Sequence, residues 1–200
     1  YVLAGRDEEL RHINSVERDE MFRNQWYGVN PMNEARSGHG AAVLNNKIYC
    51  VGGFSGAGPV RTVEAFDPET GNWSTVPSMS SKRSRAKCVS LRGFLVVVGG
   101  WDGEDRLQSC EMYDPLVNAW NPLPPMKTPR SNHSLAVMDG NIVAMGGFTN
   151  HVEMFDWDKW SWVSICPLPA RRSHMTAQVI QTKGLTALAT ERFRVKPKQI

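Results

Sequence analysis

The chain has 200 residues and a net charge of +3, and its 23 lysines and arginines are scattered along the sequence. This scattering excludes the concentrated basic footprint of a nucleic-acid-binding protein. No apolar run approaches the roughly 18 residues of a membrane-spanning helix, so we expect neither nucleic acid nor membrane as a partner.

One unit recurs along the chain. Trp26, Trp73 and Trp120 stand 47 residues apart (73 − 26 = 120 − 73 = 47), and glutamates, methionines and arginines keep the same spacing. Each of the three whole units also carries a double glycine after an apolar run. A period of about 40–50 residues with paired glycines and a late tryptophan is typical of a β-propeller blade. The sequence therefore predicts an all-β protein with four-stranded antiparallel blades.

The blades are expected in the following order. Residues 1–5 match residues 49–53, so the chain opens at the second strand of a blade, and 1–32 form its strands two to four. Whole blades are predicted at 33–79, 80–126 and 127–168. In the first of them, we expect strands at 40–44, 47–51, 62–66 and 72–76.

The end of the chain departs from the pattern. Residues 169–183 resemble the start of a further blade, but no double glycine follows them, so we expect 184–200 to be a divergent or disordered tail. The chain is accordingly expected to be a propeller fragment. An alternative is that residues 177–180 supply the missing opening strand of the first blade.

The repeated residues are interpreted as framework. The tryptophans, with Phe66, Tyr113 and Phe155, are expected to wedge between blades. The glutamates and arginines that recur in each unit should satisfy one another or loop backbone, since a buried unpaired charge is costly. These are Glu17, Glu64, Glu111 and Glu153, with Arg36, Arg83 and Arg130. The double glycines are explained by close approach of backbone at the crowded blade centre.

The cysteines indicate a reducing compartment. Cys50, Cys88, Cys110 and Cys166 have no C-x-x-C spacing, so we predict no zinc site. All four fall in predicted strands, where buried reduced thiols act as small hydrophobes. We therefore expect a cytoplasmic protein.

Catalysis finds no support in the pattern. A carboxylate repeated in every blade differs from a catalytic pair, whose two members have divergent environments. The five histidines share no spacing that suggests a metal site. We predict no catalytic residues, no metal and no cofactor, hence no enzyme.

The motif set of double glycine, V-E-x-[YF]-D-P, Trp, P-x-M and Arg-Ser resembles the kelch-repeat family over roughly residues 1–183. The resemblance is greatest to the kelch domains of BTB–BACK–kelch adaptors, which recruit substrates to cullin-RING ubiquitin ligases; some members bind actin. It implies a kelch-type β-propeller, usually of six blades. The BTB segment that would contact the ligase is absent from this chain.

The resemblance also implies a binding face of loops that differ between blades. Three positions per blade are implicated: the residue after the double glycine, the Arg-Ser junction with its neighbour, and the middle of the loop between the second and third strands. The candidate protein-binding residues are Ser37, Phe54, Ser84, Arg85, Trp101, Arg106, Ser131, Asn132, Phe148, Ser173 and His174. In the oxidative-stress-sensing adaptor of the family, arginines at the places matching Arg85 and Arg106 grip an acidic peptide.

The expected function is a protein-binding propeller that recognises a substrate protein or acidic peptide for a cullin-RING ligase. One alternative is an actin-binding cytoskeletal protein. Another is a propeller enzyme, such as an oxidase or sugar epimerase.

Overall fold

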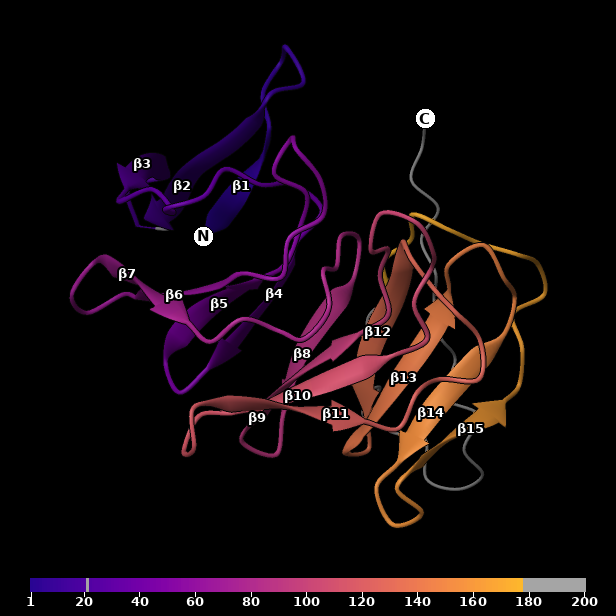
Figure 1. Cartoon of the computed structure of the whole chain (residues 1–200). Coiled ribbons are helices and arrows are strands. Elements are labelled where there is room, and N and C mark those ends of the chain that lie inside the picture. Colours follow the sequence, from indigo (N-terminus) through magenta and orange to yellow (C-terminus); the bar gives the residue numbers. More distant parts are fainter. Residues whose placement is uncertain (21, 178–200) are drawn as a thin grey trace.

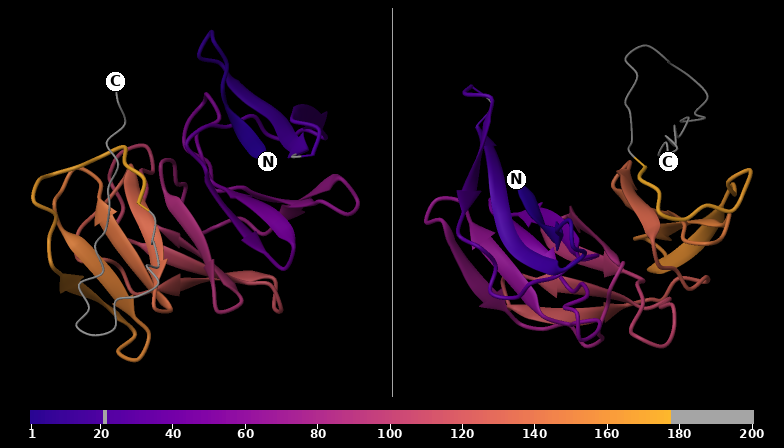
Figure 2. Two further views of the ribbon diagram at one scale, coloured as in Figure 1. Left: turned by 180° about the vertical axis from the view of Figure 1, so that it is seen from behind. Right: turned by 90° about the horizontal axis from the view of Figure 1, so that it is seen from above.

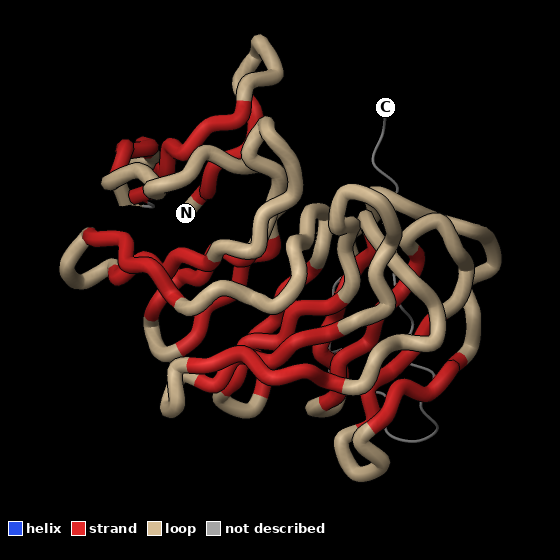
Figure 3. Tube along the Cα trace, in the orientation of Figure 1, coloured by secondary structure: helices blue, strands red, loops and turns tan. Residues whose placement is uncertain are grey.

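A computed structural model describes residues 1–20 and 22–177 of the chain. These residues form antiparallel β-sheets joined by loops, and none of them lies in a helix (Figure 3). It follows that no helix in this part of the chain is long and apolar enough to span a bilayer. The predicted all-β class with four-stranded antiparallel blades is confirmed.

Each sheet is a meander in chain order. The first has three strands, β1 (Val2–Arg6), β2 (His12–Glu20) and β3 (Gln25–Val29). The second contains β4 (Gly40–Leu44), β5 (Lys47–Val51), β6 (Val63–Asp67) and β7 (Asn72–Val76). The third contains β8 (Lys87–Leu91), β9 (Phe94–Val98), β10 (Cys110–Asp114) and β11 (Ala119–Leu123). The fourth contains β12 (His133–Met138), β13 (Asn141–Gly146), β14 (Val152–Asp156) and β15 (Ser161–Ile165).

Tight turns set the strand register. Asn45 and Asn46 join β4 to β5 with φ of 49° and 60°, the left-handed values of a two-residue hairpin that asparagine tolerates. Of the strands expected in this sheet, three match the structure and β6 begins one residue later than expected. The boundaries of the predicted blades stay predictions, and the residues beyond 177 lie outside the described part of the chain.

The four sheets follow one another in an arc (Figures 1 and 2), with the first and last at its two ends. The first strands of the whole sheets line the inside, where β4 contacts β8 and β8 contacts β12. The core lies between facing sheets. β9 supplies Val96 and Val98 to one interface and Leu95 and Val97 to the other, and all four are fully buried. A strand covered on both faces is expected to be continuously apolar.

The late tryptophans pin each sheet to its predecessor. The indole Nε1 of Trp73 donates to the carbonyl of Asn30, 2.8 Å away, and that of Trp120 donates to Pro77, also at 2.8 Å. Trp162 repeats the bond to Pro124 at 3.0 Å. The expected wedge role is confirmed for these three residues. Trp26, in the first described sheet, is instead 54% exposed.

The repeated arginines and glutamates form buried ion pairs, as expected. Arg36, Arg83 and Arg130 have fully buried side chains and lie 2.7–2.9 Å from Glu64, Glu111 and Glu153. Each glutamate also accepts a backbone N–H from the connector that carries the arginine. Glu17 differs: it is exposed and has no ion pair within the described residues. In the other sheets the arginine comes from the connector before the first strand, and no such connector precedes β1 among the described residues.

The double glycines meet backbone of the next sheet, which confirms close approach as their cause. Gly99 has φ of 59°, and a Cβ built on it would stand 2.6 Å from the carbonyl oxygen of Arg130. Gly100 donates its N–H to that same carbonyl at 2.7 Å. No other residue type fits such a contact without displacing one sheet from the other.

The cysteines are all free, and three are buried as predicted. Burial raises the pKa of the Cys50, Cys88 and Cys110 thiols to about 12. The expectation for Cys166 was wrong, because β15 ends at Ile165 and Cys166 is exposed. Pro167 explains this end: proline has no N–H to continue the ladder.

Candidate protein-binding face

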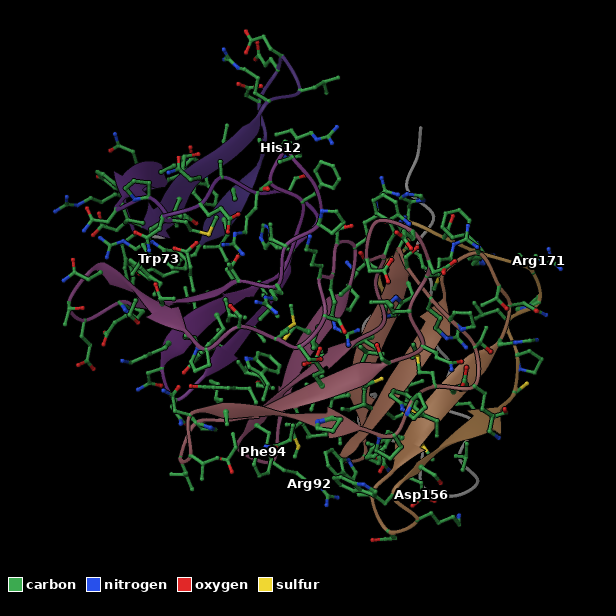
Figure 4. All side chains as sticks on the ribbon, in the orientation of Figure 1. His12, Trp73, Arg92, Phe94, Asp156 and Arg171 are labelled. Carbon is green, nitrogen blue, oxygen red and sulfur yellow. The ribbon has the colours of Figure 1, made fainter. Side chains whose placement is uncertain are left out.

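The predicted site residues gather along one edge of the sheets. This loop edge consists of the loops after each second strand (residues 52–62, 99–109 and 147–151) and the Arg-Ser connectors (36–39, 83–86, 130–133 and 172–174). It lies at the top of Figure 1, and the short turns lie at the opposite edge. In Figure 4, His12 marks the loop edge, whereas Arg92, Phe94 and Asp156 mark the opposite one.

Within a sheet, backbone pairing brings the three predicted positions together. Ser37 pairs with Phe54, and Ser84 pairs with Trp101, through N–H···O bonds of 2.8–3.0 Å. Trp101 also pairs with Arg106 across its own loop. The serine, the aromatic residue and the mid-loop arginine of the third sheet therefore lie side by side as a short extension of the sheet.

Between sheets, a chain of backbone hydrogen bonds links the residues after the junction serines. Arg85 donates its N–H to Gly38 at 2.6 Å, Asn132 donates to Arg85 at 3.1 Å, and His174 donates to Asn132 at 2.9 Å. All four have positive φ, between 52° and 61°. Because both the backbone bonds and the dihedrals are fixed, the directions in which these side chains leave the backbone are fixed too.

Aromatic contacts join the third and fourth sheets. The guanidinium carbon of Arg106 lies 4.3 Å from the centre of the Phe148 ring, within cation–π range. His174 meets the same ring edge-on, with centroids 5.7 Å apart. Phe148 is 40% exposed despite these contacts. The loop edge thus presents several exposed cationic side chains, Arg85 and Arg106 among them, and Arg106 lies against a partly exposed apolar ring.

The remaining predicted residues differ in exposure. Ser84 and Ser131 are only 1% and 3% exposed, which puts them under the face, and the Ser84 hydroxyl lies 3.4 Å from the Trp101 carbonyl. Half-buried positions are taken by Ser37, Phe54, Trp101, Asn132 and Ser173. We therefore regard the two buried serines as supports of the loops, and drop them from the contact set.

Two features of the face escaped the sequence analysis. His12, at the start of β2, stacks on Phe54 of the second sheet with centroids 5.4 Å apart. Phe148 has φ of 70°, and in its short loop it is Thr149 that pairs with the connector, through Arg172. The loop after Gly147 is shorter than the corresponding loops of the second and third sheets, and this difference in length is the sequence signal for the changed pairing at Thr149. No signal in the sequence marks the stacking of His12 on Phe54.

His133 lies fully buried beneath the loop edge, and His39 is half-buried there. Burial, reinforced by the positive charges of nearby arginine and lysine, lowers the pKa of His133 to about 3 and that of His39 to about 4. Neither ring nitrogen of His133 has a hydrogen-bond partner within the described residues. Both histidines are consequently neutral at pH 7 and add no charge to the face.

Comparison with known proteins identifies the repeat. The model of the KLHDC2/KLHL20/DRC7 kelch-repeats domain matches residues 1–147, and the kelch-motif model matches residues 129–169. This chain belongs to the kelch-repeat family. Similar curated kelch proteins include kelch-like protein 15 of Mus musculus, Homo sapiens and Danio rerio, each 34% identical over 68 residues. That match covers 34% of this chain and about 11% of each relative.

The kelch assignment agrees with the chemistry of the loop edge. In a kelch blade the strands repeat, and the loops are free to differ. Among residues 1–20 and 22–177, no group of three or more His, Cys, Asp or Glu side chains is arranged to hold a metal ion. The exposed groups include the cations Arg85 and Arg106 and the ring of Phe148, beside the carboxylates Glu104 and Asp105. Such a mixture of charges and an aromatic ring suits noncovalent recognition of another protein.

Proposed function

We propose that this chain is a protein-binding kelch domain whose loop edge recognises an acidic segment of another protein. The observation that carries the proposal is the exposed pair Arg85 and Arg106, neither of which has an ion-pair partner within the described residues. An arginine fork pairs a carboxylate through two parallel hydrogen bonds. An acidic chain laid across the third sheet would supply the missing counter-charges.

The surroundings of the two arginines favour a peptide over a small anion. Arg106 packs against Phe148 in the fourth sheet. Arg85 lies against Gly38 in the connector to the second sheet, where its Cγ would be 3.6 Å from a Cβ added to that glycine. The cations are therefore spread across neighbouring sheets. Phe148 and the half-buried Trp101 offer apolar contacts beside them, as aromatic residues at interface hot spots do.

The proposal is tested by partner capture with the tagged full chain. Arg85→Ala and Arg106→Ala should each weaken partner binding by about 1.5–3 kcal/mol, the range for hydrogen bonds to a charged group. Higher salt should weaken binding further, because it screens exposed charges. Arg18→Ala is the matched control, since Arg18 is also exposed but lies on β2, away from the loop edge. Unchanged capture by both loop-edge variants would refute the assignment.

For the whole protein, we further propose the role of substrate-recognition part of a cullin-RING ubiquitin ligase adaptor. The support is the match to kelch-like proteins; the ligase contact itself would need a BTB segment, which these residues do not include. Co-purification of a cullin with the full-length protein tests it. Co-sedimentation with actin filaments would favour the cytoskeletal alternative, and turnover of a sugar or oxidation of a substrate would favour an enzyme.

We also propose a cytoplasmic location, on the grounds that all four cysteines are free although three of them are embedded in the core. Reducing compartments keep thiols in this state. Imaging of the tagged full-length protein tests this, and a secreted product would contradict it.

A further inference from the structure

A second basic site lies at the junction of the second and third sheets, apart from Arg85 and Arg106. A shallow pocket of about 290 Å³ opens between the loop after β5 and the connector before β8. Among the described residues, its only charged lining residues are Arg61 and Lys82, and two hydroxyl residues, Ser55 and Thr62, complete its polar lining. The described lining contains no carboxylate.

The pocket walls are held by backbone hydrogen bonds. The backbone N–H of Met79 donates to the carbonyl of Arg61 at 3.0 Å, and that of Arg83 donates to the carbonyl of Val60 at 3.0 Å. The N–H of Val60 in turn donates to the carbonyl of Gly53 at 2.9 Å. The first two bonds hold the two chain segments side by side, and Arg61 and Lys82 line the same pocket from these two segments. The site is therefore formed by the fold and does not depend on a loop closing over it.

The same junction recurs in other sheets, but with different side chains. The carbonyl of Arg61 accepts an N–H from the following connector, and the same backbone bond is made by the carbonyls of Asn14, Gln108 and Asn150. The amide of Asn14 turns back to donate to Met32 at 2.7 Å, and that of Asn150 donates to Leu168 at 3.4 Å. Arg61 makes no such return bond within the described residues. Lys82 is likewise replaced at the matching connector positions by Ala35, Pro129 and Arg171.

The two cations lack counter-charges. In the part of the chain that the structure describes, neither Arg61 nor Lys82 takes part in an ion pair or a side-chain hydrogen bond. Glu34, a carboxylate bonded to the lining residue Thr62, also accepts a hydrogen bond from Arg36. The charge of Glu34 is thus paired with Arg36. Arg61 and Lys82 remain as two positive charges at the pocket, and neither residue is part of the repeated framework.

We propose that this pocket binds a phosphate monoester, in the form of a phosphorylated serine or threonine side chain of a partner protein. A phosphorylated side chain carries a charge of about −1.5 to −2 at pH 7 and three strong acceptor oxygens. That charge matches Arg61 and Lys82 together, and a carboxylate would balance only one of them. The site is independent of the acidic-segment proposal, because it uses neither Arg85 nor Arg106.

The test is an NMR titration of the full chain, labelled with ¹⁵N, at constant ionic strength. Inorganic phosphate and O-phosphoserine are the probes, with glutamate as the carboxylate comparison. Both phosphate probes should shift the amides of residues 55–58, 60–62 and 81–83 saturably, and O-phosphoserine should bind at least tenfold more tightly than glutamate. Arg61→Asn and Lys82→Ala should each weaken O-phosphoserine at least tenfold. Both variants insert residues that the fold already carries at matching positions, so they should stay folded.

The controls separate this site from the others. Arg171→Ala changes the position that matches Lys82 in the connector after the fourth sheet, and Arg85→Ala changes the proposed acidic-segment site. Both variants should leave the phosphate shifts unaltered. Absence of saturable shifts, or shifts retained in Arg61→Asn, would overturn the proposal. Binding of inorganic phosphate without O-phosphoserine would overturn the protein-bound source, and equal binding of glutamate would overturn the preference for phosphate.

Discussion

Removal of the Glu111 carboxylate should be among the most damaging single changes in the third sheet. Arg83 is fully buried, and Glu111 accepts from its Nε at 3.1 Å and from its Nη2 at 2.9 Å. The same carboxylate accepts the backbone N–H of Ser80 at 2.7 Å. Glu111→Ala leaves a buried guanidinium and a connector N–H without these partners. The expected loss is about 3–5 kcal/mol, the usual cost of breaking a buried pair from one side.

Urea unfolding followed by tryptophan fluorescence measures this loss, and the chain provides its own control. Glu17 occupies the same repeat position but is exposed and unpaired within the described residues, so Glu17→Ala should stay within about 0.5 kcal/mol of the parent. Arg83 keeps its bonds to the carbonyls of Gly99 and Ser109 in either case. If the Glu111 and Glu17 variants lose equal stability, the buried pair does not secure the sheet junction and our reasoning fails.

Three further predictions concern stability and reactivity. Cys166 should be the only one of the four thiols to react quickly with a thiol reagent in the native protein, and Cys166→Ser should abolish this fast phase. His133 has a pKa of about 3 in the folded protein against an ordinary 6.5, so its contribution to stability is intact above pH 6.5 and is lost as the pH falls toward 3. The loss is up to about 1.4 kcal/mol per pH unit. Urea unfolding at pH 7 and pH 5 should therefore show a smaller drop in the free energy of unfolding for His133→Leu than for the parent. Gly99→Ala should lower the free energy of unfolding by about 1–3 kcal/mol more than Gly93→Ala, because both glycines have positive φ but a Cβ at Gly93 meets no atom within 4 Å.

The sheet framework could be predicted because it repeats. A residue such as Trp73, Trp120 or Trp162 returns at a nearly constant distance only if it makes the same contact in each sheet, and the structure shows that contact as an indole bond to the preceding sheet. The buried pairs of arginine and glutamate follow from the same logic. Glu17 departs because its pairing depends on a connector before the first strand of its blade, and the first described sheet begins at the second strand, as the repeat predicted.

The binding face could be predicted only in part, because the loops that form it do not repeat. Position along the blade was enough to bring Arg106 and Trp101 together. It did not reveal that Ser84 is buried, that His12 stacks on Phe54, or that the short loop of the fourth sheet exposes Phe148. These features depend on loop length and on contacts between neighbouring sheets, and neither leaves a periodic trace in the sequence.

Selection from a random peptide library tests the central claim, that the loop edge binds acidic segments, and it does so before any partner is identified. The immobilised full chain should enrich peptides rich in Asp and Glu. Their affinity, measured by fluorescence polarisation, should fall at least tenfold in Arg106→Ala and should be unchanged in Arg18→Ala. Enrichment of neutral or basic peptides would contradict the account. So would binding that survives Arg106→Ala but is lost in Arg92→Ala, whose side chain lies at the opposite edge against Trp157.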